Sequence, residues 1–211
     1  MDVAVPTPSR RTGRFARTLG ALVLRLFGWR VEGQLGAVPR AVLIAAPHTS
    51  NWDFVFMLAC AYVLHLRPMW LGKQQMFRWP FGGFMRWLGG VPVNRGQRDD
   101  LVRQVVERFA ATPELLLVVP PAGTRGRAPH WKSGFYHIAS GAGVPIVCTF
   151  LDYHRRVGGI GPAIMPSGDL CADMDLIRDF YEGVTGMYPE QATPVRLREE
   201  DLATCNSSAA G

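Results

Sequence analysis

Short, almost entirely apolar runs recur along this chain and are separated by segments with helical spacing. Three of them occupy residues 41–47, 115–119 and 144–151. A strand with one face in water alternates apolar and polar residues, so a continuous apolar run indicates a strand covered on both faces. Helices supply that cover when strands and helices alternate. The sequence therefore predicts an α/β fold: a single domain with a mixed, largely parallel sheet flanked by helices.

The remaining elements follow from periodicity and turn residues. A further strand is expected over residues 68–72, and helices are expected over 51–64, about 99–111 and 134–142. The chain contains no internal repeat or linker that would divide it. We therefore expect an N-terminal tail and helix in residues 1–30, one folded domain in 31–195, and a flexible tail in 196–211.

Residues 14–29 predict a basic amphipathic helix. Its apolar side chains repeat on one face, and arginines lie away from that face. The apolar positions are Phe15, Leu19, Leu22, Val23 and Leu26. Such a helix can lie in a membrane interface or pack on the body of the domain, and one helix can do both. No stretch reaches the roughly 18–20 apolar residues that a bilayer-spanning helix needs.

The charge and composition favour a membrane surface over nucleic acid as a partner. Residues 1–151 contain 18 Lys and Arg but only seven Asp and Glu, whereas residues 152–211 contain five and ten. The chain is nevertheless 48% hydrophobic and 19% charged, which is more apolar than nucleic-acid-binding proteins usually are. A basic, apolar protein fits an anionic membrane surface, and we expect peripheral, monotopic attachment.

No metal or cofactor site is expected. The four cysteines form no CxxC pair and are interpreted as reduced thiols of a cytoplasmic protein. The histidines have no metal-binding spacing with Cys, Asp or Glu, and the acidic run at 169–179 is typical of a solvated surface. The chain has no GxGxxG or Walker motif.

The first chemical motif follows the predicted strand at 41–47. His48 stands at the carboxyl end of this strand, where α/β proteins place their chemistry, and Asp53 follows five residues later. The two side chains can meet if His48 lies on the loop and Asp53 in the first turn of the next helix. The carboxylate would then orient the imidazole, whose other nitrogen could accept a proton from a hydroxyl. Taken alone, this spacing is weak evidence for catalysis and favours a loop histidine with a structural role.

Four blocks together carry a family resemblance. The segment APHTSNWDF, which contains His48 and Asp53, resembles the first signature of the PlsC-like glycerolipid (1-acylglycerol-3-phosphate) acyltransferase family. Three further blocks resemble the later signatures in the family's order: GGVPVNR at 89–95, PAGTR at 121–125 and GVPIV at 143–147.

The resemblance implies a membrane-associated O-acyltransferase of phospholipid biosynthesis with the HX4D motif. Such an enzyme moves a fatty acyl group from acyl-CoA or acyl carrier protein, its co-substrate, to a hydroxyl of a lysophospholipid such as 1-acylglycerol-3-phosphate. It acts at the cytoplasmic face of the membrane without a covalent acyl-enzyme. His48 would be the general base and Asp53 its orienting partner. The acceptor phosphate would be held by Arg95, Gly123, Thr124 and Arg125.

Three observations leave alternatives open. Lys73 and Lys132 are either phosphate contacts or solvated lysines. The aromatic residues of 74–87 fit an interfacial belt, the lining of an acyl-chain channel or core packing. Ala122 stands where the family has Glu. That departure allows an acyltransferase for a non-glycerolipid acceptor, or a weakened homologue that only binds lipid.

Overall fold

The structure is a computed structural model and describes residues 12–93 and 98–202. Their strands form one seven-stranded sheet in the order β1-β7-β6-β2-β5-β3-β4. Every neighbouring pair is parallel except β6 and β7. This confirms the predicted α/β class with a mixed, largely parallel sheet. The strands are β1 (Arg30–Glu32), β2 (Arg40–Ala46), β3 (Met69–Lys73), β4 (Gly90–Val93), β5 (Leu115–Val119), β6 (Ile146–Asp152) and β7 (Val157–Ile164).

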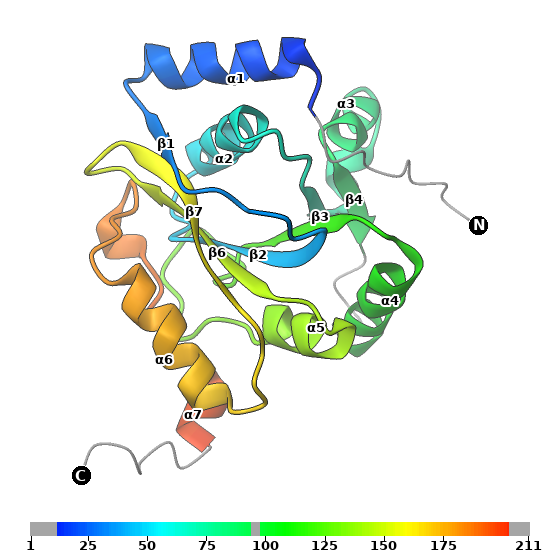
Figure 1. Ribbon diagram of the computed structural model, residues 1–211, viewed down its shortest axis with the longest axis vertical. Helices are drawn as coiled ribbons and strands as arrows, with labels where there is room; N and C mark the ends of the chain where they lie inside the picture. The colour runs from blue at the N-terminus through cyan, green and yellow to red at the C-terminus, as the bar shows by residue number, and fades with distance from the viewer. Residues whose placement is uncertain (1–11, 94–97, 203–211) are drawn as a thin grey trace.

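Helices cover both faces of this sheet, which lies between two helical layers in Figure 1. Val42 and Ile44 of β2 face α4, α5 and α6, whereas Ala41 and Leu43 face α2 on the other side. All four side chains are buried, which explains the uninterrupted apolar run. The described helices are α1 (Arg14–Leu26), α2 (Trp52–Val63), η1 (Gln74–Phe77), α3 (Gly82–Trp87), α4 (Arg98–Ala111), α5 (Gly134–Ala142), α6 (Leu170–Tyr181), η2 (Pro189–Gln191) and α7 (Arg198–Leu202).

The predicted N-terminal helix is α1, and it packs on α2 through two small residues and one leucine. Ala16, Gly20 and Leu24 are its buried residues. A Cβ atom on Gly20 would lie 2.9 Å from the carbonyl oxygen of Ala59, so glycine permits the close approach of the two helices. The large apolar side chains point into solvent instead: Phe15, Leu19, Leu22 and Leu26 are exposed. No described helix combines the length and apolar character that crossing a bilayer requires.

Strands β1 and β7 and helix α6 are among the elements that the sequence does not predict. Strand β7 has the sequence VGGIGPAI, whose glycines and proline are poor strand formers. The short edge strand β1 pairs with it, and a Cβ on Gly159 would lie 2.1 Å from the carbonyl oxygen of Glu32. Helix α6 contains the acidic run expected to be solvated. Asp169 caps this helix, but Asp173 is buried and accepts a hydrogen bond from the Tyr136 hydroxyl.

The C-terminal region also differs from the expected flexible tail. Leu197 is fully buried and forms a bridge with Trp131, and α7 follows it. Spacing alone cannot reveal such a contact, because the partner lies more than sixty residues earlier. The expectation that all four cysteines are reduced is wrong for Cys171, which is disulfide-bonded. Cys60 and Cys148 are free, and burial raises the pKa of each thiol to about 12.

Candidate active site

The site lies at the carboxyl ends of four adjacent strands. β2 ends at Ala46, and the chain then passes through His48 before α2 begins at Trp52. Asp53 is therefore in the first turn of α2. The Nδ1 atom of His48 and the Oδ2 atom of Asp53 are 3.0 Å apart. The two side chains meet in the arrangement that their spacing allows, with the histidine on the loop and the carboxylate reaching back from the helix.

Asp53 is held by more donors than His48 alone. Its Oδ2 atom also accepts the backbone N–H groups of Thr49 and Ser50, at 2.8 and 2.9 Å. Its Oδ1 atom accepts the hydroxyl of Tyr153 at 2.6 Å. Because an ionised carboxylate only accepts, the proton of the neutral imidazole is on Nδ1. The Nε2 atom of His48, which bonds to no residue that the structure describes, is then the basic nitrogen.

The surroundings of Asp53 keep it ionised. Burial by itself would raise the pKa of Asp53, but the hydrogen bonds from His48, Tyr153 and the Ser50 N–H outweigh it, so the pKa lies below its ordinary value of 3.8. Burial, together with the bond to Asp53, raises the pKa of the Tyr153 hydroxyl. Tyr153 therefore stays protonated and donates.

This lowered pKa predicts how stability depends on pH. The folded protein binds a proton at Asp53 less readily than the unfolded chain does, so the carboxylate's contribution is fully present above the unfolded pKa of about 4 and is lost as pH falls further. We expect the difference in unfolding free energy between the unmutated protein and Asp53→Asn to be constant from pH 7 to about 5. It should shrink below pH about 4. Denaturant unfolding at each pH measures it, and a difference that persists unchanged to pH 3 would contradict the prediction.

Most of the predicted substrate-binding residues surround the same open cavity, which has a volume of about 1560 Å³. Lys73 is the last residue of β3, the loop with Gly123, Thr124 and Arg125 follows β5, and Lys132 lies further along. All five line the cavity with His48 and Asp53. The topology explains this, because β2 and β3 are both neighbours of β5 and their carboxyl ends meet. Arg95 lies outside the described residues.

The loop after β5 brings its cations close to the histidine. Gly123 adopts a φ of +67°, which favours glycine, and a Cβ there would lie 2.7 Å from the Nζ atom of Lys132. The Lys132 side chain therefore runs along the turn. The guanidinium of Arg125 donates to the Oδ1 atom of Asn51, on the loop between His48 and α2. Side chains from the first and third sequence blocks thus contact each other directly.

Ala122 adds no polar group to this wall. It is buried and packs in the main core with Trp131 and Phe135. A carboxylate enters the same cavity from elsewhere: Glu199, in α7, lines it and accepts a hydrogen bond from the Ser133 hydroxyl.

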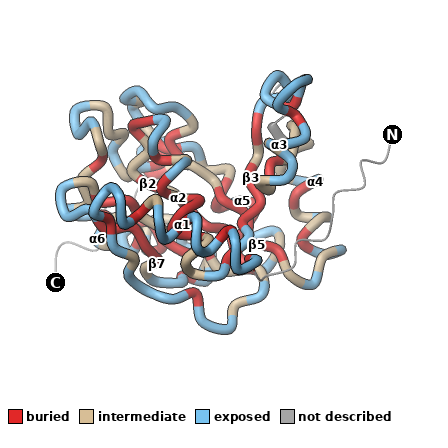
Figure 2. The backbone as a smooth tube through the Cα atoms, turned by 90° about the horizontal axis from the view of Figure 1, so that it is seen from above, coloured by how far each residue is buried: buried red, intermediate tan, exposed pale blue. Residues whose placement is uncertain are grey.

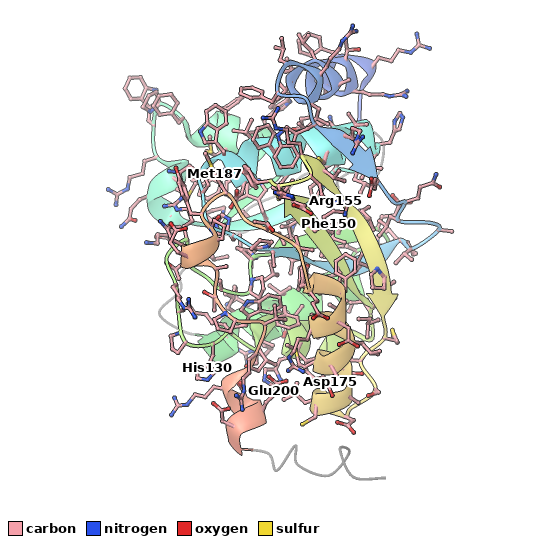
Figure 3. All side chains as sticks on the ribbon, turned by 90° about the vertical axis from the view of Figure 1, so that its left-hand side faces the viewer. His130, Phe150, Arg155, Asp175, Met187 and Glu200 are labelled. Carbon is pink, nitrogen blue, oxygen red and sulfur yellow. The ribbon has the colours of Figure 1, made fainter. Side chains whose placement is uncertain are left out.

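Residues 193–201, here named the C-terminal strap, hold the segment after the Gly123 turn. The backbone N–H of Trp131 donates to the carbonyl of Arg196 at 2.8 Å, and the Nε2 atom of His130 lies 2.8 Å from Asp201. Glu200 anchors the strap to α6 through Arg178 at 2.7 Å. Figure 3 labels His130 and Glu200 together at the lower end of the molecule.

Three contributors to the site are not predicted by the sequence. Tyr153 follows β6 and reaches Asp53 from a hundred residues away, because β6 is the other neighbour of β2. The strap falls mostly in the region expected to be a flexible tail. Asn51 has the residue type of a helix cap, and its position between His48 and Asp53 in the first block is the one signal for its contact with Arg125.

Comparison with known proteins identifies the family. A family model described as Acyltransferase matches residues 30–151, which is more than half of the chain. The chain belongs to this family. The matched span contains β2, α2, β3, β5 and most of β6, and so all the predicted site residues.

The chain is also similar in sequence to individual acyltransferases. The chain is 31% identical over 146 residues to the 1-acyl-sn-glycerol-3-phosphate acyltransferase of Haemophilus influenzae, covering 64% of this chain and 58% of that protein. For the Escherichia coli protein of the same name the identity is 27% over 152 residues, covering 67% and 60%. The chain thus spans about three fifths of the length of these curated relatives.

A solved structure matches the fold. The 1-acyl-sn-glycerophosphate acyltransferase PlsC of Thermotoga maritima superimposes with a TM-score of 0.57 at 17% identity, over 80% of this chain and 78% of that one. The Acyltransferase domain described here therefore has the fold of that protein. Among the residues that the structure describes, no three His, Cys, Asp or Glu side chains are grouped so that they could hold a metal ion.

Proposed function

We propose that this protein transfers a fatty acyl group from acyl-CoA or acyl carrier protein to a hydroxyl of a lysophospholipid such as 1-acylglycerol-3-phosphate. One observation carries the proposal: the His48–Asp53 pair shares a cavity with the cationic side chains of Arg125 and Lys132. A base and a phosphate-binding wall in one cavity suit an acceptor that carries both a hydroxyl and a phosphate.

The chemistry follows from the orientation of the histidine. The Nε2 atom of His48 takes the proton of the acceptor hydroxyl while Asp53 stabilises the resulting imidazolium. The oxygen attacks the thioester carbonyl, a new C–O bond forms, and the C–S bond breaks. The imidazolium returns its proton to the departing thiolate. His48 and Asp53 are thereby restored, and no acyl group is ever attached to the protein.

The cavity also has an apolar wall suited to acyl chains. Leu43, Ala61, Leu66 and Trp70 line it and belong to the core cluster between the sheet and α2. A fatty acyl chain gains free energy from such a wall in proportion to the apolar area removed from water. Base, cations and apolar surface thus lie in one continuous cavity.

We further propose that the protein attaches peripherally to an anionic membrane at its cytoplasmic face, and the exposed face of α1 supports the attachment. Phe15 is 77% exposed and Leu26 73% exposed, although burial is the rule for such side chains in a helix that packs on a domain. Arg14, Arg17 and Arg25 lie on the same helix and can reach lipid phosphates. An acceptor dissolved in the bilayer would then be available to the cavity.

Product analysis with a lysophospholipid panel tests this function. Incubated with labelled acyl-CoA or acyl carrier protein, the protein should acylate 1-acylglycerol-3-phosphate at least about tenfold faster than a phosphate-free monoacylglycerol. The reason is that Arg125 and Lys132 can bind the phosphate and have no partner in the monoacylglycerol. Mass spectrometry of the products measures both rates. The buried Ala122 motivates the competing candidate, an acyltransferase for a non-glycerolipid acceptor. Failure to acylate any lysophospholipid on the panel would favour that candidate.

A further inference from the structure

Besides α1, the segment between β3 and β4 also exposes large apolar side chains, most of them aromatic. Trp79 is 93% exposed and Phe81 68%, and three more apolar side chains of this segment are exposed: Met76, Phe84 and Trp87. We name these five residues the aromatic segment. Core packing is therefore not their role, and Met76 alone among them lines the cavity. Two of them, Phe84 and Trp87, stack with ring centroids 5.9 Å apart, and a gathering of large exposed apolar side chains marks an interaction site.

The backbone holds these side chains outward. Phe77, between Met76 and Trp79 in sequence, is buried against Trp70, with ring centroids 5.7 Å apart. A Cβ on Gly82 would lie 2.0 Å from the carbonyl oxygen of Phe77, so only glycine permits this close turn. The exposed rings thus project from a turn anchored in the core. In Figure 2, α3 stands out from the body of the molecule with pale blue, exposed backbone.

The charge around the aromatic segment is uniformly positive. Residues 54–98 contain six Lys and Arg and no Asp or Glu. Arg78 and Arg86 lie among the exposed rings, and Arg86 sits 5.7 Å from the ring centroid of Phe77. Trp with Arg is the combination that membrane interfaces favour, because the ring enters the headgroup layer while the cation binds lipid phosphate.

The position of the segment matches that of α1. Both α1 and α3 lie toward the upper end of the molecule in Figure 1, whereas α6 and α7 lie at the lower end. Asp175 and Glu200, labelled at that lower end in Figure 3, belong to the acidic part of the chain. Exposed apolar and basic groups thus lie at one end, whereas Asp175 and Glu200 at the other end are paired with Arg178.

We propose that the aromatic segment is a second membrane contact, which inserts into the headgroup layer of an anionic bilayer beside the mouth of the cavity. Together with α1 it fixes the orientation of the protein on the bilayer. Because Met76 belongs to both the segment and the cavity wall, the lipid acceptor enters the cavity at this contact. The proposal rests on the proposed function, since it concerns how a lipid substrate reaches that site.

Vesicle partitioning of matched variants tests the proposal. The double variant Trp79→Ala/Phe81→Ala should bind vesicles of equal phosphatidylglycerol and phosphatidylcholine about tenfold more weakly than the unmutated protein, because two aromatic side chains no longer enter the interface. The control Leu176→Ala removes a side chain that is 55% exposed on α6, at the acidic end. It should change binding less than about twofold.

Fluorescence quenching locates the contact without weakening the fold. The emission of the unmutated protein minus that of Trp79→Phe reports Trp79 alone. Brominated lipids should quench this difference. Unchanged partitioning of the double variant, or no quenching of the Trp79 emission, would overturn the proposal. So would a dimer of the unmutated protein that the double variant converts to monomer, because the rings would then serve a second copy.

A rate measurement separates this proposal from the proposed function. With a short-chain lysophosphatidic acid below its micellar concentration, the double variant should retain the rate of the unmutated protein. A protein that acylates this soluble acceptor but binds vesicles equally well with and without the rings supports the function and overturns the contact. Weaker vesicle binding by the double variant, in a protein that acylates nothing, supports the contact and refutes the function.

Discussion

Replacing His48 by alanine is expected to lower kcat for acyl transfer by about a thousandfold, within the range of roughly 10²–10⁴ that a general base contributes. The loss should be in kcat, because the proposed base acts on the hydroxyl proton in the transition state, while the proposed phosphate-binding wall stays intact. Single-turnover transfer from labelled acyl-CoA or acyl carrier protein measures it.

A surface histidine provides the control for this experiment. His154 lies in the exposed turn between β6 and β7, and His154→Ala should retain the rate of the unmutated protein within about twofold. Undiminished transfer by His48→Ala would refute the assigned base. Equal losses in both variants would mean that the rate reports folding and not chemistry.

Asp53→Asn is expected to lower kcat by about a hundredfold. The cause is the loss of the negative charge that stabilises the imidazolium, because the imidazole ring of His48 should keep its orientation. The N–H groups of Thr49 and Ser50 both need an acceptor where Oδ2 now lies, so they should select the rotamer with the amide oxygen there. His48 Nδ1 keeps its acceptor and its tautomer. The amide NH₂ then faces Tyr153, whose hydroxyl can rotate to accept.

Tyr153 makes this account of Asp53→Asn testable. Tyr153→Phe alone should cost kcat only about threefold to tenfold, because Asp53 retains three donors. In the Asp53→Asn background the same change removes the acceptor of the NH₂ group and should cost clearly more than it does alone. Rates for the two single variants and the double variant form the cycle. Strict additivity of the two effects would contradict the proposed rotamer.

The chemistry that sequence predicts best is local. His48 and Asp53 are five residues apart, so one strand end and one helix start suffice to bring them together. The short apolar runs likewise predict β2, β5 and the alternation with helices, because a short, continuously apolar run is typical of a strand covered on both faces. Gly134–Ala142 forms the helix that its spacing predicts.

The features that the sequence does not predict depend on strand order and on strands of unusual composition. Tyr153 and Arg125 approach the first block only because β6 and β5 flank β2, and no local pattern encodes which strands are neighbours. β7 contains residues that disfavour strands, and tertiary pairing overrides that preference. The expected helix appears as α1, but sequence could not show that Ala16, Gly20 and Leu24 are its buried residues while Phe15, Leu19, Leu22 and Leu26 stay exposed.

The C-terminal strap links two parts of the molecule thermodynamically. Its backbone bond to Trp131 and its contact with His130 join it to the segment that carries Lys132, so the strap cannot detach without loosening that segment. Such coupling is reciprocal. A phosphate bound by Lys132 would make detachment of the strap rarer, and any protease, ligand or modification that favours a detached strap would weaken the hold on the acceptor.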